Sequence, residues 1–324
     1  MTPSPLARVV DGVLEATVVG SFTRIGYGAR RRLYGWTPLE QLRLDGKTAI
    51  VTGATSGLGR CAAELLARQG ATVEIVGRDA ERTERARSEL AALGGTVSSG
   101  LAALSLLAQV RAYAVDFAAR HDRLDVLVHN AGSLTHPYTV TEEGNEVTLA
   151  THVLAPFLLT ALLRPLLEAT PPSRVVLVTS GGAYTQPLDV DALDPPAESY
   201  DGVKAYARCK RAQVALVREW ARRWAGSGIA VNAMHPGWAD TPGIRTALPR
   251  FSRLLGPLLR TPEQGADTIA WLAAAPEAAA VGGALFLDRR PRATHRLRRT
   301  RRPDEAEEAD RLWRLCEERT GVAG

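Results

Sequence analysis

Short apolar runs alternate with longer segments of helical periodicity from about residue 45 onward. The runs have the length and composition of buried strands, and they lie at 48–52, 72–76, 126–129, 174–179, 229–235 and 284–287. The helical segments between them lie at 60–69, 80–93, 104–120, 144–167, 206–224 and 262–274. Repeated strand–helix units predict a parallel sheet with helices on both faces. We therefore expect a single α/β domain over 45–288, doubly wound, in three α/β/α layers.

One strand position and the N-terminal region depart from this pattern. Residues 94–103 should hold the third strand, but they are rich in Gly, Ser and Ala, so we expect a weak or short strand. Residues 1–44 form a predicted helical extension. Its apolar residues at helical spacing are Leu6, Val9, Val10, Val13, Leu14, Thr17 and Val18. Such an amphipathic helix either lies on a membrane surface or packs its stripe against the domain, and we expect packing.

Charge is concentrated near the C-terminus. The chain has a formal net charge of +5, and residues 289–302 contain eight arginines and no acid. An acidic run at 304–310 follows almost at once. This order predicts a basic, then acidic C-terminal tail over 289–324, with a helix, whose charges compensate one another in solvent. A nucleic-acid patch is the alternative, and we expect no nucleic-acid partner.

The number and spacing of the cysteines and the hydropathy pattern indicate in which cellular compartment the protein is expected. The three cysteines, Cys61, Cys209 and Cys316, are far apart, so they predict neither a disulfide framework nor a metal site. Asp11 and Glu15 interrupt the N-terminal apolar stretch, which argues against a signal peptide. No membrane span is expected, because no run approaches the length of about 18 apolar residues that crossing requires. We expect a cytoplasmic protein with no metal.

The stretch 48–59 reads Thr-Ala-Ile-Val-Thr-Gly-Ala-Thr-Ser-Gly-Leu-Gly and joins a strand, a glycine turn and the start of a helix. Glycines let the backbone approach a pyrophosphate, and a helix N-terminus offers free N–H groups. These parts predict a Rossmann-type dinucleotide site. After the second strand, Gly77-Arg78 stands where an acidic residue would bind the adenosine ribose, and Arg78 is suited to a 2′-phosphate. NADP(H) is therefore favoured over NAD(H), although Asp79 follows at once.

Two pairs of residues fit a tyrosine–lysine site on one helix face. Tyr206 and Lys210 are four residues apart, so they share a face. A nearby ammonium favours the phenolate and suits the tyrosine to acid–base work. Tyr200 and Lys204 have the same spacing. We favour the later pair because small Cys209 precedes the lysine and a sustained helical pattern follows.

The order of the motifs resembles that of the short-chain dehydrogenase/reductase family. The glycine spacing follows TGxxxGxG, and 129–132 reads His-Asn-Ala-Gly where the family has NNAG. A strand leads to Ser180, Tyr206-x-x-x-Lys210 follows, and 236–241 matches PGxxxT. The segments that look like the member-12 branch, which is similar to retinol dehydrogenases, are 22–27, 180–182, 206–207, 210–211, 234–243, 264–268, 286–291 and 294–295.

The resemblance implies a role for each matched residue. It implies that Ser180, Tyr206 and Lys210 are catalytic, with Ser180 bonding the substrate oxygen. The implied cofactor-binding residues are Gly53, Thr55, Ser56, Gly57, Leu58, Gly59, Arg78, Asn130, Ala131, Gly132, Tyr206, Lys210, Pro236, Gly237 and Thr241.

Two positions depart from the family. His152 stands where an Asn holds a water of the proton relay, and we include it among the catalytic candidates because imidazole also bonds water. Ala103 replaces an Asp near the adenine, which should weaken cofactor binding.

The leading hypothesis is an NADP(H)-dependent oxidoreductase that interconverts a carbonyl and an alcohol. Apolar residues after Thr241 favour a lipophilic substrate, with an amphipathic core helix as the equal alternative. His152 and Ala103 support a different reading, a catalytically weak NAD(P)-binding regulatory or scaffold protein. The resemblance leaves a homo-oligomer open.

Overall fold

One mixed sheet runs through the molecule in a computed structural model that describes residues 5–247 and 249–324. Among these residues eight strands pair in the order β3-β2-β1-β4-β5-β6-β7-β8. All neighbours are parallel except β7 and β8. The strands are β1 Thr48–Thr52, β2 Thr72–Gly77, β3 Thr96–Leu101, β4 Val126–His129, β5 Ser173–Val178, β6 Ile229–Met234, β7 Leu285–Leu287 and β8 Arg290–Arg292. The predicted doubly wound α/β fold is confirmed.

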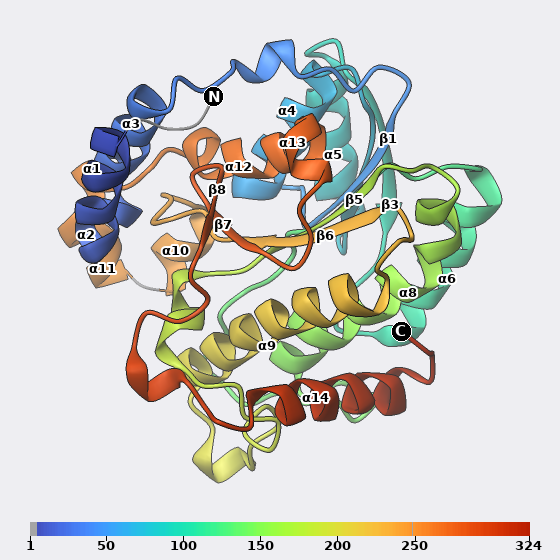
Figure 1. The fold of residues 1–324 in the computed structure, drawn as a ribbon. Helices are drawn as coiled ribbons and strands as arrows, with labels where there is room; N and C mark the ends of the chain where they lie inside the picture. The colour runs from blue at the N-terminus through green and yellow to red at the C-terminus, as the bar shows by residue number, and fades with distance from the viewer. Residues whose placement is uncertain (1–4, 248) are drawn as a thin grey trace.

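Helices cover both faces of the sheet (Figure 1). The longer helices are α1 Pro5–Ala16, α3 Arg24–Leu33, α4 Gly57–Arg68, α5 Ala80–Ala91, α6 Leu107–Arg120, α8 Ala155–Glu168, α9 Gly202–Arg223, α12 Pro262–Ala274 and α14 Glu305–Thr320. The shorter ones are α2 Val18–Phe22, α7 Val147–Leu149, α10 Pro242–Ala247, α11 Pro249–Leu255 and α13 Pro276–Ala279. Strand order reverses between β1 and β4, and in such sheets ligands bind beyond the strand ends at that point.

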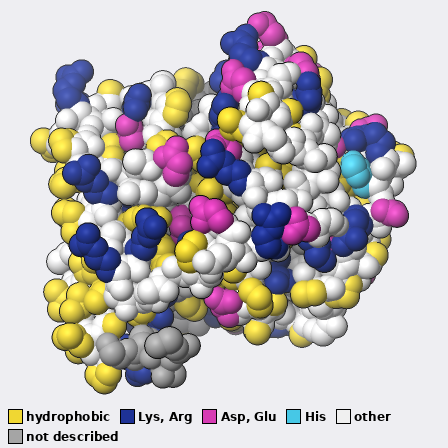
Figure 2. Space-filling view, turned by 90° about the horizontal axis from the view of Figure 1, so that it is seen from above, with side chains coloured by type: hydrophobic (Ala, Val, Ile, Leu, Met, Phe, Trp, Pro, Cys, Tyr) yellow, Lys and Arg dark blue, Asp and Glu magenta, His cyan; other side chains and the backbone are white. Residues whose placement is uncertain are grey.

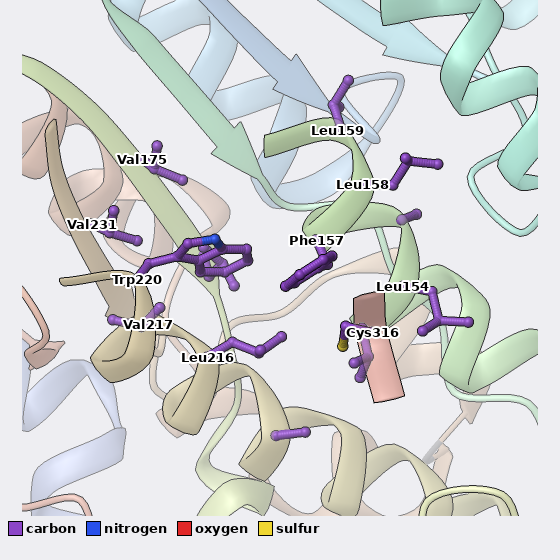
Figure 3. Close-up of a cluster of buried hydrophobic side chains, with 14 of the residues drawn as sticks. Leu154, Phe157, Leu158, Leu159, Val175, Leu216, Val217, Trp220, Val231 and Cys316 are labelled. Carbon is purple, nitrogen blue, oxygen red and sulfur yellow. The ribbon is translucent and has the colours of Figure 1, made fainter. Parts of the chain in front are cut away.

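Each face of the sheet has its own apolar core. The core on one face contains residues from α4, α5 and α12. The core on the other face contains residues from α6, α8 and α9, and also from α14. Figure 3 shows part of this second core, where Phe157 faces Trp220 and Cys316 lies beside them. The Phe157 ring stacks on Trp220 with centroids 5.8 Å apart.

The third strand and the C-terminal region differ from the sequence expectation. Strand β3 is six residues long and pairs along its whole length with β2, because backbone hydrogen bonding does not depend on its small side chains. The region after 288 is not a solvated tail: it adds β8 to the sheet edge, and α14 buries Trp313 and Cys316. Its arginines pair beyond their own segment, as Arg289 does with Asp267.

The N-terminal helices do not pack as expected. On α1 the buried residues are Ala7 and Asp11, whereas Leu6, Val9 and Val13 are exposed. The expectation that the apolar stripe packs against the domain is therefore wrong. The physical reason is an ion pair: the Asp11 carboxylate lies 2.7 Å from the fully buried guanidinium of Arg30. The helix turns its charged side inward to meet it.

The helix predicted over 144–167 is interrupted. A π-helical turn, Ala150–Leu154, separates α7 from α8, and His152 lies on it. Turns of this kind occur frequently at functional sites. By length and composition Val147–Glu168 is suited to cross a membrane, but 72% of its apolar 18-residue window is buried inside the protein, as expected of a core helix.

Candidate functional site

The end of β5 and the start of α9 bring a hydroxyl and a phenol together. Ser180 follows β5, and its Oγ accepts a hydrogen bond from the Gly182 N–H at 3.2 Å. Tyr206 lies in the second turn of α9, close enough to Ser180 for that side chain to influence its phenol. Burial raises the pKa of the Tyr206 phenol, and Ser180 only partly opposes this. The phenol therefore keeps its proton at neutral pH.

Lys210 lies one turn further along α9, with its Nζ 5.5 Å from the centroid of the Tyr206 ring. The ammonium donates to the carbonyl oxygen of Val178 at 2.8 Å. Burial lowers the pKa of Lys210 to about 7. The pKa of the phenol is thus shifted upward, opposite to the lowering that the sequence predicted, because burial outweighs the opposing effect of Ser180.

His152 packs against the same tyrosine. Its ring meets the Tyr206 ring edge-on, with centroids 5.2 Å apart. Nε2 lies 3.0 Å from the carbonyl oxygen of Ser133, whereas Nδ1 is buried without a partner among the described residues. Burial, and to a lesser degree Lys210, lowers the pKa of His152 to about 3. The imidazole is neutral, and since Nε2 must donate to the carbonyl, Nδ1 is an unused acceptor.

The competing pair, Tyr200 and Lys204, lies elsewhere. The Tyr200 hydroxyl donates to Glu146 at 3.0 Å and lies 3.0 Å from the Thr148 hydroxyl. Lys204 is exposed and pairs with Asp201 at 3.6 Å. Neither group contacts Ser180 in any interaction that the described residues form, so the structure gives this pair a local structural role.

The glycine loop between β1 and α4 leaves no room for side chains. Gly53 has a φ of +66°, and a Cβ there would lie 2.7 Å from the Cα of Ala131. A Cβ at Gly59 would overlap the Asn130 amide and the Gly53 carbonyl. Gly57 lies beside Thr241, with 3.5 Å between the added Cβ and that of the threonine. The loop thus brings α4's N-terminus up against the segment after β6.

The other residues of this loop have distinct surroundings. Ser56 precedes α4 without capping it through its side chain, and its hydroxyl and that of Thr55 are partly exposed. Leu58 packs on α12, where a Cβ at Gly265 would lie 2.5 Å from its Cδ2. Leu58 therefore anchors the turn to the core.

Asn130 braces the glycine loop. Its Nδ2 donates to the carbonyl oxygens of Thr52 and Gly53 at 2.9 and 3.2 Å. The N–H groups of Asn130 and Ala131 both donate to the Thr52 hydroxyl. Gly132 follows, next to the His152 ring. Asn130 is therefore a positioning residue for the loop that carries Gly53.

Arg78 is exposed at the end of β2, and within the described residues it forms no hydrogen bond or ion pair. Asp79 is occupied: its carboxylate accepts from the Arg82 N–H at 2.8 Å and caps α5. Thr55 lies against Gly77, 2.9 Å from its added Cβ, and belongs to a small hollow. That hollow is lined by Thr55, Arg60, Arg82, Arg85, Ala86 and Glu89.

The segment after β6 is held from three sides. The Trp238 N–H donates to the carbonyl oxygen of Phe22 at 2.8 Å, and the Arg260 N–H donates to that of Trp238. The Arg260 guanidinium donates to the carbonyl of Pro236, and Gly237, at φ +71°, leaves space for it. Thr241 caps the start of α10 by accepting from Ile244.

These residues fit a dinucleotide. The loop has a cradle that side chains would fill, a helix N-terminus faces it, and an unpaired arginine marks the adenosine end. When bound there, the nicotinamide group supplies or accepts a hydride. Groups of three or more potential metal-binding side chains are absent from the described residues.

The comparisons with known proteins agree with this geometry. A family model described as short chain dehydrogenase matches residues 47–249. The protein belongs to the short-chain dehydrogenase/reductase family. It is 39% identical over 302 residues to dehydrogenase/reductase SDR family member 12 of Bos taurus, covering 92% of this chain and 93% of that protein. Retinol dehydrogenase 14 of Mus musculus is 37% identical over 263 residues, 76% of this chain and 78% of that protein.

A solved structure is also similar. A short-chain dehydrogenase from Burkholderia cenocepacia in complex with NADP has a TM-score of 0.62 and 28% identity, covering 75% of this chain and 96% of that one. As a member of the family this protein is an NAD(P)-dependent oxidoreductase, and enzymes of the family act on small carbonyl or alcohol compounds. The resemblance to the member-12 branch is confirmed.

Sequence reasoning missed several residues near the site. Val178 and Ser133 contribute only backbone carbonyls, which no side-chain motif can reveal. Phe22 and Arg260 reach the 236–238 segment from outside the recognised motifs. The likeness of 22–27 to the member-12 branch was the one available signal for Phe22. Ala103 follows β3, and its N–H donates to the side-chain oxygen of Gln109 at 2.9 Å.

Proposed function

We propose that the protein is an NADP(H)-dependent oxidoreductase that interconverts a carbonyl and an alcohol on a lipophilic substrate through Ser180, Tyr206 and Lys210. The observation that carries this proposal is the position of Ser180 next to the Tyr206 phenol, whose pKa it lowers against the effect of burial, beside the buried Lys210. A carbonyl oxygen bonded to both hydroxyls would be polarised as charge develops on it.

Each residue has a separate task in carbonyl reduction. Tyr206, protonated because burial raises its pKa, donates its proton to the forming alkoxide. Ser180 donates a hydrogen bond to the same oxygen. Lys210, with a pKa of about 7, exchanges protons near neutral pH and can restore the phenol. His152 positions the Tyr206 ring and offers Nδ1 as an acceptor for a relay water.

The preference for NADP(H) rests on charge. Arg78 is free to pair with a phosphate, whereas the Asp79 carboxylate is engaged in capping α5. Of the three arginines in the adjacent hollow, Arg60 and Arg85 pair with glutamates, and Arg82 has no ion pair among the described residues. A 2′-phosphate would gain charge-assisted hydrogen bonds in these surroundings, and a bare ribose would not. NADP bound to the Burkholderia relative supports the same choice.

The lipophilic substrate is supported by the walls near the site. Trp238 meets the ring of Phe251 on α11 edge-on, with centroids 5.1 Å apart. Helices α10 and α11 with the turn to residue 258 carry several apolar residues and no acid. Sites for apolar ligands are lined mainly by such groups. The similarity to a retinol dehydrogenase points in the same direction.

The proposal also covers location and assembly. We propose a cytoplasmic protein that makes peripheral membrane contact through its N-terminal helices. Self-association remains part of the proposal, but it would not use the outer faces of α8 and α9. Helix α14 covers these faces, and the ring centroids of its Trp313 and of Phe157 on α8 are 5.0 Å apart.

The test is turnover of retinal-like and aromatic aldehydes with NADPH. Tyr206→Phe should lower kcat by roughly 10²–10⁴-fold, because it removes only the proton donor. NADPH should still raise its melting temperature. Tyr200→Phe is the matched control and should retain wild-type turnover. Full activity of Tyr206→Phe would refute the assignment.

A further inference from the structure

The outward face of α1 is apolar although the helix lies on the protein surface. Leu6, Val9 and Val13 are 70%, 63% and 65% exposed. Their spacing places them along one side of the helix. A surface helix of a globular protein normally buries such a stripe, because each apolar side chain left in water forfeits part of the hydrophobic stabilisation.

This orientation is fixed by buried ion pairs. Arg30 on α3 is inaccessible to solvent and pairs with Asp11, Glu15 and Asp288 at 2.7–2.8 Å. Asp11 also accepts from the Tyr34 hydroxyl and from Arg292. Rotating α1 to bury its valines would take Asp11 and Glu15 away from the buried Arg30 and leave Asp288 as its carboxylate partner, which is strongly unfavourable. The apolar stripe therefore faces outward as a consequence of the fold.

The apolar surface extends beyond α1. Val18 and Val19 on α2 are each 47% exposed, Ile25 on α3 is 53% exposed, and Leu254 on α11 is 81% exposed. Figure 1 places α1, α2 and α11 together on the left of the molecule. Figure 2 shows hydrophobic and Lys or Arg side chains intermixed along that same left edge.

The charge on this face is positive. Within residues 5–36 all the exposed charged residues are arginines, namely Arg8, Arg24, Arg31 and Arg32. The two acidic residues of that segment, Asp11 and Glu15, form ion pairs with arginines. Helix α11 adds the exposed Arg250 and Arg253. An apolar stripe next to arginines is the pattern of a helix that lies in the interface of an anionic bilayer.

We propose that α1, α2, α3 and α11 form a docking face for an anionic lipid bilayer. A second copy of the chain fits this face less well, because it would set arginines against arginines. The face is also continuous with the candidate site. Phe22 at the end of α2 meets Trp238, with ring centroids 5.8 Å apart, and Trp238 meets Phe251 on α11. A substrate dissolved in the bilayer would thus reach the nicotinamide segment from the docked side.

The substrate route rests on the proposed enzymatic activity, whereas docking makes the proposed membrane contact specific and does not depend on that activity, so docking is measured without turnover. Full-length protein is floated with vesicles of phosphatidylcholine alone or with added phosphatidylserine. Wild type should float with the anionic vesicles and much less with neutral ones, and high salt should weaken binding. Val9→Asp with Val13→Asp should lower partitioning at least about tenfold. Arg31→Gln with Arg32→Gln should lower it only on anionic vesicles.

The matched control is Val115→Asp, since Val115 is 68% exposed and belongs to α6, a helix on the side of the molecule away from α1 (Figure 1). It should float like wild type. All variants should keep the wild-type melting temperature and NADPH shift, because the changed side chains are exposed. Absence of flotation, equal binding to neutral vesicles, or equal loss in the Val115 variant would overturn the proposal. So would a wild-type dimer that Val9→Asp dissociates, because the face would then serve self-association.

Discussion

The imidazole of His152 stands edge-on to the phenol of Tyr206, with ring centroids 5.2 Å apart and an interplanar angle of 88°. The two rings come from different elements, the π-turn before α8 and the second turn of α9. The contact fixes the direction of the phenol, while the Nδ1 lone pair of His152 remains unpaired among the described residues. His152 is therefore a positioning residue with an acceptor available to water.

This contact leads to a prediction for the pH dependence of turnover. Because burial keeps the pKa of His152 at about 3, the imidazole stays neutral between pH 5 and 9 and should add no limb near pH 6.5 to the kcat profile. His152→Asn should retain the shape of the profile, whereas His152→Ala should lower kcat more than it raises KM. His136→Asn, at an exposed position, is the control. A limb near pH 6.5 that vanishes in His152→Asn would contradict the prediction.

Buried histidines also predict acid sensitivity of the fold. Burial lowers the pKa of His129, His152 and His235 to about 3. Between about pH 6.5 and 3 the unfolded chain binds protons that the folded chain does not, so the free energy of unfolding falls as pH falls. From pH 7 to 5 each histidine should cost about 2 kcal/mol. In urea unfolding, the decrease in the free energy of unfolding from pH 7 to 5 should be smaller by that amount for His129→Asn than for wild type. An equal decrease would refute the conclusion that the folded protein keeps His129 neutral.

Arg78 should decide between the two dinucleotides. Arg78→Glu should weaken NADPH binding by about 2 kcal/mol, the value of a charge-assisted bond, and leave NADH binding similar or tighter. Thermal-shift titration measures both without a substrate. Arg68→Glu, on the far end of α4, is a charge-matched control. Equal losses for NADPH and NADH would place the phosphate elsewhere.

The buried ion network should be a major source of stability for the N-terminal helices. Arg30→Met removes the partner of Asp11 and Asp288 and should lower the free energy of unfolding by about 3–5 kcal/mol. Arg24→Met on the same helix, exposed and without an ion pair among the described residues, should change it little. Denaturant unfolding compares the two. Similar small changes in the free energy of unfolding for both variants would show that the ion network makes no net contribution to stability.

Much of the sheet and the order of the motifs followed from local sequence. Strand β1 and the loop with Gly53 and Gly59 are readable because strand periodicity and backbone clearance are local properties. The exception was β3, whose small side chains hide a strand that its neighbour β2 stabilises. The interruption at His152 was equally hidden, since a π-turn changes one hydrogen-bond register and not the apolar pattern.

Tyr200 and Tyr206 show what the local sequence pattern does not predict. Tyr200 and Tyr206 have the same spacing to a lysine, yet the fold places one beside Glu146 and the other beside Ser180. The direction of the phenol pKa was also misjudged, because burial is a property of the surrounding tertiary structure.

The sequence by itself determined the family, the doubly wound sheet and the glycine loop between β1 and α4, since these depend on short-range periodicity and glycine spacing. Only the tertiary structure decided which way α1 faces. Its amphipathic pattern fits inward and outward packing equally well, and the choice rests on Arg30 meeting Asp288, which lies 258 residues further along the chain. A buried charge must find its partners wherever they are in the sequence, and no local pattern encodes that distance.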